Sequence, residues 1–392
     1  MLSASQIELI RKNFSFHIES KEFHGRRLEH KIANIRMEDF SSASVELRRF
    51  YGPTRVIGAP IKPQCLADIK EYEISLAVPQ FASMSSAAVV GFSAVIDSDD
   101  RLFIEGIDSA SGREQILAEN KLGYHGLVLG DVNEDNQIEV TYARHKDIES
   151  ISSKALFLHN VEPGNYGSFL LRVMPQLAFA AEQKIEFDCY IAGARSSWLS
   201  ESIKMLGLPE RKIFQVNEVS GVVFDKVLAI SGVYHEGFLS SFYRKKMISL
   251  FGNIDAERRK IYCSRSLSAL ARPSYRVMKN EVEVERFLRS RGYDIVFPET
   301  LSLSEQIRLF RGSSHVIGPS GSGMVNCLFA TPGTNIVDIE TFTFNIRQHA
   351  KIYSSCELDY SFLFCTPDDA SEGNLISSSY VVDIEALESI VE

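Results

Sequence analysis

The sequence of 392 residues has no long apolar run, no C-x-x-C cysteine pair and no excess of positive charge. Nothing in it approaches the roughly 18 consecutive apolar residues that a membrane-spanning helix needs. The N-terminal stretch, MLSASQIELIRKNF, has no apolar core long enough for a secretory signal peptide. We therefore expect a cytoplasmic protein, with peripheral association at the inner face of the membrane left open.

The six cysteines lie far apart: they are Cys65, Cys189, Cys263, Cys327, Cys356 and Cys365. Several lie inside apolar runs, where a free cysteine packs as a small hydrophobic side chain. This spacing favours reduced thiols.

The chain carries 42 Lys and Arg against 51 Asp and Glu, a formal net charge of −9 with a pI near 5.6. Nucleic-acid-binding proteins usually present a basic field, so binding to a phosphate backbone is disfavoured as the main function. The 45% hydrophobic and 24% charged residues are typical of a globular protein. One core rarely serves more than about 250–300 residues, so the length favours two domains.

From about residue 54 to 145 the pattern predicts strands joined by hairpins, because apolar runs alternate with gaps rich in Asp, Gly and Ser. These runs are Arg55–Ile61, Ala88–Ile96, Leu102–Ile104, Gly126–Leu129 and Ile138–Tyr142. From about residue 155, strands alternate with helices, which is typical of a parallel sheet covered by helices. A second such series begins at Lys260.

We therefore predict an α/β fold in three regions: a β-hairpin-rich extension (1–150), a first Rossmann-like domain (151–240) and a second one (241–392). Two doubly wound units in one chain indicate a cleft between them. Ligands in such folds bind at the carboxyl ends of the strands.

The most informative motif lies between residues 311 and 340. An apolar run leads into a turn made of Gly318, Pro319, Ser320, Gly321, Ser322 and Gly323, followed by a helical pattern, a Pro-Gly turn and the apolar run Asn335–Ile339. Small residues let the backbone approach an anion, and a helix start offers unpaired N–H groups. The order of the glycines is not that of a dinucleotide fingerprint, and no P-loop lysine follows. The turn therefore predicts a phosphate site; the alternative is a tight strand–helix connection.

Two arginines follow another predicted strand, Lys260–Cys263, which lies earlier in the chain. Ser264 and Arg265 come at its carboxyl end, and Arg272 lies in the loop beyond it. A guanidinium group matches two phosphate oxygens, so this loop is a second candidate for binding an anion. The alternative for each arginine is a surface ion pair.

A third polar segment, His159–Ser168, also follows a strand and opens a helix. It is typical of a catalytic or acceptor-binding loop, and the alternative is a turn capped by Asn165 or Ser168. Two residues at other strand ends join the candidates. His235 can supply a base, or a structural hydrogen bond. Glu340 can bind a ribose, or cap a helix.

Two acidic segments resemble metal loops. Asp97–Asp100 contains a D-x-D but lies between two strand runs, which favours a hairpin turn. Asp131–Asn136 resembles the start of a calcium loop but has Asn136 where glycine is needed and Tyr142 where the bidentate Glu belongs. We predict no metal site from either.

The C-terminal half resembles the family 61 glycosyltransferases, whose bacterial members are often found in capsule and cell-surface polysaccharide synthesis. The matching elements are Tyr262-Cys263-Ser264-Arg265, Arg272, Asn280-Glu281, Leu301–Ile307, Gly318–Asn326 and Pro332-Gly333-Thr334, with Asn165–Leu170 and Pro175 upstream. They cover roughly residues 155 to 365. The chain departs from the family pattern at Ser168 and Ser320, where many members have His, and at Arg172, where many have Asp.

The resemblance implies a GT-B fold, in which the C-terminal Rossmann-like domain binds a nucleotide-sugar and the other one binds the acceptor. It implies an inverting hexosyl- or pentosyltransferase that uses a glycan or lipid-linked glycan acceptor, with no cofactor and no metal. The expected donor-binding residues are Ser264, Arg265, Arg272, Ser320, Gly321, Ser322, Gly323 and Glu340; the expected acceptor-binding residues are Asn165, Tyr166 and Ser168. As catalytic base we expect Glu162, with His159 and His235 as further candidates. The alternatives are a catalytically impaired sugar-nucleotide- or glycan-binding protein and a GT-B-like sugar-nucleotide epimerase.

Overall fold

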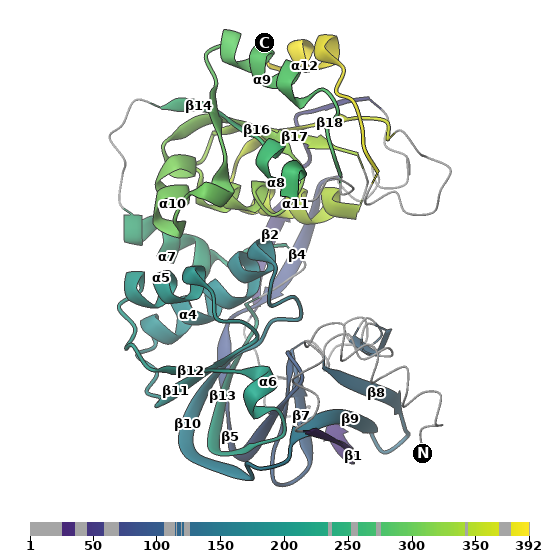
Figure 1. Ribbon diagram of the computed structural model, residues 1–392, viewed down its shortest axis with the longest axis vertical. Helices are drawn as coiled ribbons and strands as arrows, with labels where there is room; N and C mark the ends of the chain where they lie inside the picture. Colours follow the sequence, from purple (N-terminus) through teal and green to yellow (C-terminus); the bar gives the residue numbers. More distant parts are fainter. Residues whose placement is uncertain are drawn as a thin grey trace. The chain divides into compact units, whose positions relative to one another are not determined.

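The computed structural model describes residues 26–35, 45–58, 70–105, 114, 116–118, 120, 126–233, 237–251, 258–271, 276–341, 344–367 and 378–391. The chain divides into two compact units. Unit 1 takes the residues up to 44 and 77–233, and unit 2 takes 45–76 and the chain from 234 onward. Each unit is built on its own large sheet (Figure 1).

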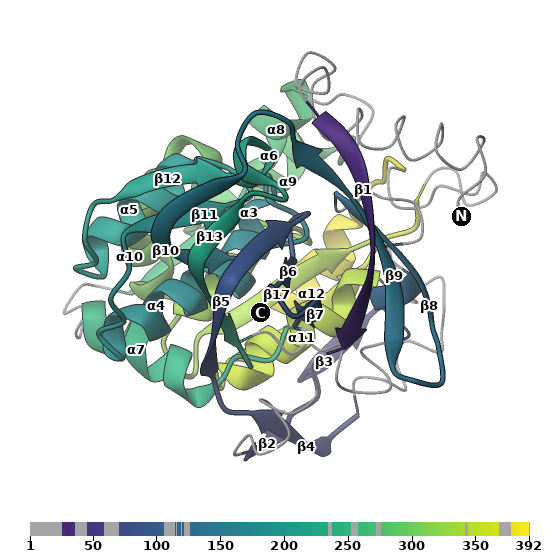
Figure 2. The same ribbon diagram turned by 90° about the horizontal axis from the view of Figure 1, so that it is seen from below.

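The sheet of unit 1 has ten strands in the order β12-β11-β10-β13-β5-β6-β7-β1-β9-β8 (Figure 2). Their bounds are β1 Arg26–Ile35, β5 Gln80–Val90, β6 Ala94–Ile96, β7 Arg101–Ile104, β8 Leu127–Val132, β9 Gln137–His145, β10 Ser150–Leu158, β11 Cys189–Ala192, β12 Lys212–Gln215 and β13 Val223–Ser231. Strands β12, β11, β10 and β13 run parallel, whereas β13–β5–β6–β7 is antiparallel.

The helices of unit 1 connect these parallel strands. They are α3 Tyr166–Ser168, the π-helical segment η3 Phe169–Val173, α4 Met174–Glu182, α5 Ser197–Met205 and α6 Val216–Val219. The π-helical turn ends at Val173, two residues before Pro175, which cannot donate the backbone hydrogen bond of a regular helix. Widened turns of this kind are often found at functional sites.

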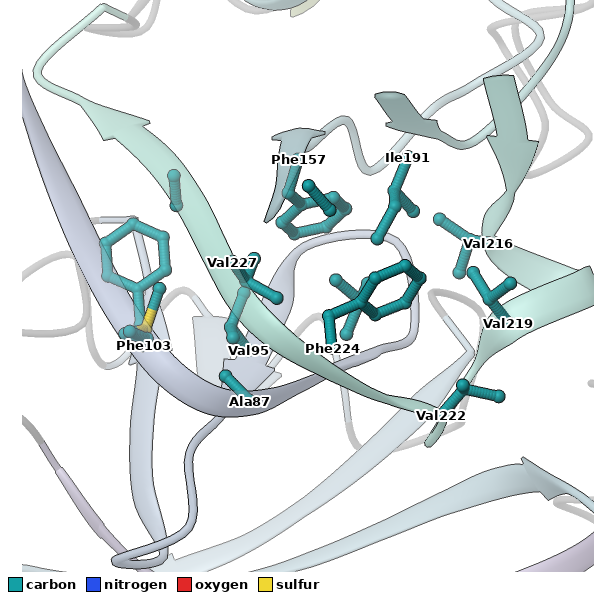
Figure 3. Close-up of a cluster of buried hydrophobic side chains, with 14 of the residues drawn as sticks. Ala87, Val95, Phe103, Phe157, Ile191, Val216, Val219, Val222, Phe224 and Val227 are labelled. Atoms are coloured by element: carbon teal, nitrogen blue, oxygen red, sulfur yellow. The ribbon is translucent and has the colours of Figure 1, made fainter. Parts of the chain in front are cut away.

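One face of this sheet carries an apolar cluster, to which Val216 and Val219 of α6 also belong (Figure 3). Phe157 from β10, Phe224 from β13 and Phe103 from β7 all belong to it. In a flat sheet, β7 and β10 would lie four strand spacings, or roughly 19 Å, apart. The sheet is therefore strongly curved, and its strands wrap around this cluster.

The sheet of unit 2 has six strands, all parallel, in the order β15-β14-β16-β17-β18-β3. Their bounds are β3 Arg55–Ile57, β14 Arg259–Cys263, β15 Asp294–Val296, β16 Ser313–Pro319, β17 Asn335–Glu340 and β18 Asp359–Phe364. A separate ribbon of β2 Val45–Phe50 and β4 Tyr72–Ala77 packs with it through contacts between β2 and α11.

Helices cover both faces of this sheet (Figure 1). They are α7 Ser241–Phe251, α8 Ser266–Ala271, α9 Glu281–Ser290, α10 Leu303–Arg311, α11 Phe344–Ser355 and α12 Ile384–Val391, with the short 3₁₀ helices η4 Pro298–Thr300 and η5 Met324–Phe329. Leu288 of α9 and Leu387 of α12 pack on one face with Tyr262, Ile317 and Val337. Helices α10, α11 and η5 pack together on the other face.

The predicted α/β class is confirmed, and strands alternate with helices after residue 155, as predicted. One detail was wrong. The predicted strand Ala88–Ile96 is a hairpin, because β5 ends at Val90 and β6 begins at Ala94. The helical pattern after Gly323 forms the 3₁₀ helix η5.

The sheet of unit 1 continues across the boundary that was predicted near residue 150. Strand β10, which begins at the predicted boundary near residue 150, pairs with β13, and β13 pairs with β5 of the predicted extension. Residues 45–76, from that same extension, belong to unit 2. The division into three functional regions therefore stays a prediction.

The five described cysteines are buried and free, so the expectation of packed, reduced thiols is confirmed for them. Burial raises the pKa of Cys189 to about 11 and that of Cys365 to about 12. Within the described part of the chain, no helix has the length and apolar character that crossing a bilayer requires.

The D-x-D segment forms the expected hairpin turn. Asp97 is buried between β6 and β7, and its Oδ1 accepts the backbone N–H groups of Asp99 and Arg101, both at 3.0 Å. Its Oδ2 accepts the Arg101 Nε–H at 2.8 Å. The Asp97 carboxylate thus closes the turn.

Candidate active site

Three neighbouring strands of unit 2 deliver the predicted donor-binding residues to one edge of the sheet. Strand β14 ends at Cys263, just before Ser264 and Arg265, and β16 ends at Pro319, just before the Gly/Ser turn. Strand β17 ends at Glu340. Since β14, β16 and β17 are adjacent and parallel, these segments lie side by side.

The guanidinium group of Arg265 lies at the Gly/Ser turn. A Cβ atom added to Gly321 would lie 3.7 Å from Arg265 Nη1, and Gly321 has a φ of +152°. A side chain at this position would be strained and would enter the space beside the guanidinium group. The backbone of the turn and the cation of Arg265 therefore face the same small region, as the phosphate-site prediction requires.

A buried carboxylate holds the loop that carries Arg265. Glu281, 5% exposed at the start of α9, accepts the Arg265 backbone N–H at 2.6 Å and the Ser264 hydroxyl at 3.1 Å. The Ser264 hydroxyl is also 2.7 Å from Glu285. Ser264 therefore directs its hydroxyl to α9, and Glu281 fixes the backbone from which the Arg265 side chain extends.

Burial raises the pKa of Glu281 above its ordinary value of 4.5, although the hydrogen bonds from Arg265 and Ser264 oppose the rise. A raised pKa in the folded state means that stability is lost as the pH rises from below 4.5 through the folded pKa. Glu281→Gln removes this ionisation and keeps an oxygen for the Arg265 N–H. Wild type should lose stability as the pH rises through this window, whereas Glu281→Gln should not. We therefore expect the difference between the thermal midpoints of Glu281→Gln and wild type to grow with increasing pH.

Thermal unfolding at a series of pH values measures this difference. The matched control is Glu283→Gln, since Glu283 is exposed on the same helix. A wild-type pH slope in Glu281→Gln would contradict the assignment.

Gly318, at the start of the Gly/Ser turn, packs closely against Met324 and Cys263. A Cβ atom on Gly318 would lie 2.7 Å from Met324 Sδ and 2.9 Å from Cys263 Cβ, so glycine is needed for this close approach. The Ser320 amide donates to the Ile339 carbonyl oxygen at 2.8 Å. The amides of Gly321 and Gly323 are thus the candidates in this turn for binding an anion.

The Ser320 hydroxyl faces a buried polar cluster. It lies 3.3 Å from His349 Nδ1, and Ser320 is fully buried. His349 Nδ1 is also 2.6 Å from Asp338 Oδ2, which accepts the Tyr353 hydroxyl at 2.6 Å. Burial, followed by the charge of Asp338, raises the pKa of Tyr353 well above its ordinary value. This cluster anchors the turn from α11 and contributes to its rigidity.

Glu340 is fully buried, and its Oε1 accepts the Thr341 N–H at 2.9 Å and lies 3.3 Å from Arg276 Nη2. Arg276 and Arg265 also lie close enough to the Tyr380 phenol for both to oppose the rise in its pKa that burial causes. Two guanidinium groups therefore approach this edge of the sheet. Arg272, the second arginine predicted from the sequence, lies outside the described residues.

The acceptor-loop candidates lie in unit 1 after β10. Asn165 caps α3, and its side chain accepts the Ser168 N–H at 3.1 Å, which confirms the capped-turn interpretation. The buried Ser168 hydroxyl donates to Asn160 Oδ1 at 2.6 Å. Tyr166 packs edge-on against Trp198, with ring centroids 4.9 Å apart. Glu162 is exposed on this loop.

His159 is 2% exposed and lies at the end of β10. Gln176 of α4 accepts the His159 backbone N–H at 3.2 Å and donates to its carbonyl oxygen at 2.9 Å. His159 Nε2 is 2.6 Å from the Ile230 carbonyl oxygen, and Nδ1 is 3.5 Å from Glu105 Oε2. The remaining catalytic candidate, His235, lies outside the described residues.

Three residues of these sites carry no strong signal in the sequence. Glu105 follows a strand run, Arg276 follows a proline loop, and His349 lies four residues before Tyr353 on one helix face. The sequence places each of these residues where a functional side chain can occur. Only the fold shows which partner each side chain contacts. Among the described residues, no group of three or more His, Cys, Asp or Glu side chains is placed to hold a metal ion.

Part of the chain is similar to a known protein family. The glycosyltransferase 61 family model matches residues 166–337, a range that holds α3 to α5 of unit 1 and the Arg265 loop and Gly/Ser turn of unit 2. No curated protein matches the chain. The match shows a glycosyltransferase, an enzyme whose substrates are a sugar donor and an acceptor.

Proposed function

We propose that this glycosyltransferase is an inverting enzyme that moves a hexosyl or pentosyl group from a nucleotide-sugar to a glycan or lipid-linked glycan during synthesis of a cell-surface polysaccharide. The observation that carries the proposal is the Arg265 guanidinium group beside Gly321, at the carboxyl edge of a parallel sheet. We further propose a GT-B arrangement, with unit 2 as the donor-binding unit and unit 1 as the acceptor-binding unit.

The departing nucleoside diphosphate gains negative charge as the bond between the sugar and the phosphate breaks. Preorganised cations and amide dipoles stabilise such charge more strongly in the transition state than in the bound substrate. Arg265 and the amides of Gly321 and Gly323 are placed to do this, and Arg272 stays a predicted partner. This supports a reaction in which guanidinium groups stabilise the leaving group; that no metal or cofactor takes part stays a prediction.

Of the other predicted donor residues, Ser264 and Ser320 position the site through Glu281 and His349. Ser322 stays a predicted contact of the phosphates, and Glu340 stays a predicted contact of the ribose.

Inversion by direct displacement requires a base for the acceptor hydroxyl. The oxygen of the acceptor attacks the anomeric carbon as the phosphate oxygen leaves with the bonding electron pair, and the proton passes to the base. The predicted candidates are Glu162, His159 and His235, with Asn165, Tyr166 and Ser168 near the acceptor. We propose that the reaction takes place in the cytoplasm, at the inner face of the membrane when the acceptor is lipid-linked.

A thermal-shift screen tests the donor site. Nucleoside diphosphates and their sugar conjugates with uracil, guanine, thymine, adenine and cytosine bases are added separately to the protein. A ligand present at about 100 times its Kd adds roughly 2.7 kcal/mol to stability, and we expect such a shift for one base. Transfer is then assayed with p-nitrophenyl glycosides, and NMR of the product gives the anomeric configuration.

The outcomes separate the candidate functions. Transfer with inverted configuration supports the proposal, and retained configuration contradicts inversion. Stabilisation without turnover favours a binding protein, consistent with the departures at Ser168, Arg172 and Ser320. Conversion of the donor without any acceptor favours an epimerase.

A further inference from the structure

Two aromatic side chains from different loops meet at the carboxyl edge of the sheet in unit 1. Tyr166 opens α3 after β10, and Trp198 lies in the first turn of α5 after β11. Strands β10 and β11 are adjacent and parallel, so the segments that follow them lie side by side. Parallel sheets of this kind bind their ligands at this edge. The two rings therefore lie where a ligand of unit 1 is expected.

The two loops that carry these rings are packed against each other. A Cβ atom on Gly193, directly after β11, would lie 2.4 Å from Pro163 Cβ in the loop after β10, so glycine is needed for this close approach. Each loop also ends in a capped helix. The side chains of Asn165 and Ser196 each accept a backbone N–H group of the helix that follows, at 3.1 and 3.2 Å. Both segments are thus fixed before any ligand binds.

The rings of Tyr166 and Trp198 form an inclined pair. Their centroids are 4.9 Å apart and their planes are inclined by 63°, so the edge of one ring meets the face of the other. The buried Phe169 also packs beside Trp198, with ring centroids 6.0 Å apart. Tyr166 and Trp198 are only partly buried, so each keeps surface that a ligand can reach. Rings held in place in this way bind a ligand with little loss of side-chain entropy.

The chemistry of this pair matches a saccharide. A sugar ring carries C–H bonds on its faces, which pack on the negative face of an aromatic ring, and hydroxyl groups at its rim. The tyrosine hydroxyl and the indole N–H are hydrogen-bonding groups for such hydroxyls, and the exposed Glu162 adds a carboxylate in the same loop. A planar nucleobase, in contrast, can lie flat on only one of two planes inclined by 63°.

We propose that Tyr166 and Trp198 form a saccharide-binding platform, which holds a sugar residue of the acceptor glycan on unit 1. Its role as the acceptor subsite rests on the proposed function, whereas saccharide binding itself does not. Tyr166 was an expected acceptor contact. Trp198 belongs to none of the predicted motifs, and its place in the site follows from the contact between the two loops.

Trp198 is the single tryptophan of the chain, so its fluorescence reports directly on the platform. The full-length protein is titrated with the methyl glycosides of glucose, galactose, mannose and xylose, in both anomeric forms, and with sorbitol as the polyol control. We expect a saturable change in emission with at least one glycoside and none with sorbitol. Uridine, which absorbs light, is compared with the glycosides by saturation-transfer NMR and should give no signal.

Variants separate the platform from binding elsewhere. Tyr166→Ala keeps the reporter and removes one ring, so we expect the Kd for the glycoside to rise at least about 10-fold, because the ring contributes both buried area and its own contact with the sugar. Trp198→Ala should lose the NMR signal of the glycoside, and Trp198→Phe should keep part of it. Phe81→Ala is the matched control, since Phe81 is 51% exposed on β5 of the same unit. It should bind with the wild-type Kd.

Tyr166→Leu and Trp198→Leu keep apolar volume without a ring and carry the same expectation where an alanine variant does not fold. The platform is overturned by wild-type affinity in the variants at both positions, by a wild-type protein that responds to no glycoside, or by uridine binding in place of the glycosides. Transfer to p-nitrophenyl glycosides would leave the proposed function standing in each of these cases. Glycoside binding at the two rings without any transfer keeps the platform and overturns the proposed function.

Discussion

Arg265→Ala is expected to lower kcat/KM about 30- to 900-fold, because loss of one preorganised donor to the leaving group costs about 2–4 kcal/mol of transition-state stabilisation. The guanidinium group lies beside Gly321, whereas the Arg265 backbone N–H is held separately by Glu281. The substitution therefore removes the cation and leaves the loop anchored. Steady-state kinetics with the donor identified by thermal shift measure the effect.

Arg259→Ala is the matched control. Arg259 lies at the opposite end of the same strand, is exposed, and pairs with Asp294 at 2.7 Å. We expect wild-type kinetics for this variant, and for Arg265→Lys an intermediate rate, since lysine keeps the charge but loses the planar fork. If Arg265→Ala retains wild-type turnover, Arg265 does not contact the diphosphate and the donor site must be sought elsewhere.

Arg244→Met is expected to destabilise unit 2 by about 3–5 kcal/mol, because buried acceptors would lose a charged donor. Arg244 of α7 is buried and donates to the carbonyl oxygens of Leu328 at 2.5 Å and Ala330 at 2.6 Å. A third carbonyl oxygen, that of Cys356, lies 3.5 Å away. One side chain therefore connects α7, the end of η5 and the end of α11.

Hydrogen exchange followed by mass spectrometry locates this effect. Peptides from α7 and η5 should lose protection in Arg244→Met, whereas peptides from β10 and β13 in unit 1 should not. Lys245→Met, at the exposed neighbouring position on α7, is the control and should exchange as wild type does. Wild-type protection in Arg244→Met would show that the three carbonyl groups find other donors.

The sequence predicted the parallel part of each unit well, because buried parallel strands are continuous apolar runs and their helices show a clear period. The second series was predicted to begin at Lys260, and its first strand, β14, begins at Arg259. Strand β1, in contrast, contains Arg26, Glu29 and Lys31, and its alternation is too weak to separate it from a loop. Strands whose second face is exposed lack the apolar run that identifies a buried strand.

The residues of the candidate sites also fall into two groups, those that could be predicted from the sequence and those that could not. The Gly/Ser turn and Arg265 could be predicted, because glycine order and a strand-end arginine are local signals. Glu105 could not, because its contact with His159 depends on how strongly a ten-stranded sheet curves. Arg276 and His349 also depend on long-range contacts, with Glu340 and Asp338 respectively. Local patterns locate the loops, and the tertiary fold decides which side chains meet.

The assignment of residues 45–76 to unit 2 has a consequence for how the protein folds during synthesis. Strand β3 pairs with β18, so Arg55 lies opposite Ser361. The early segment must therefore wait until the ribosome has made almost the whole chain, whereas the strands of unit 1 are complete much sooner. Contacts so distant in sequence slow folding. A fragment that begins after residue 233 would lack β3 and leave one edge of β18 unpaired, so the C-terminal part of unit 2 should be produced together with residues 45–76.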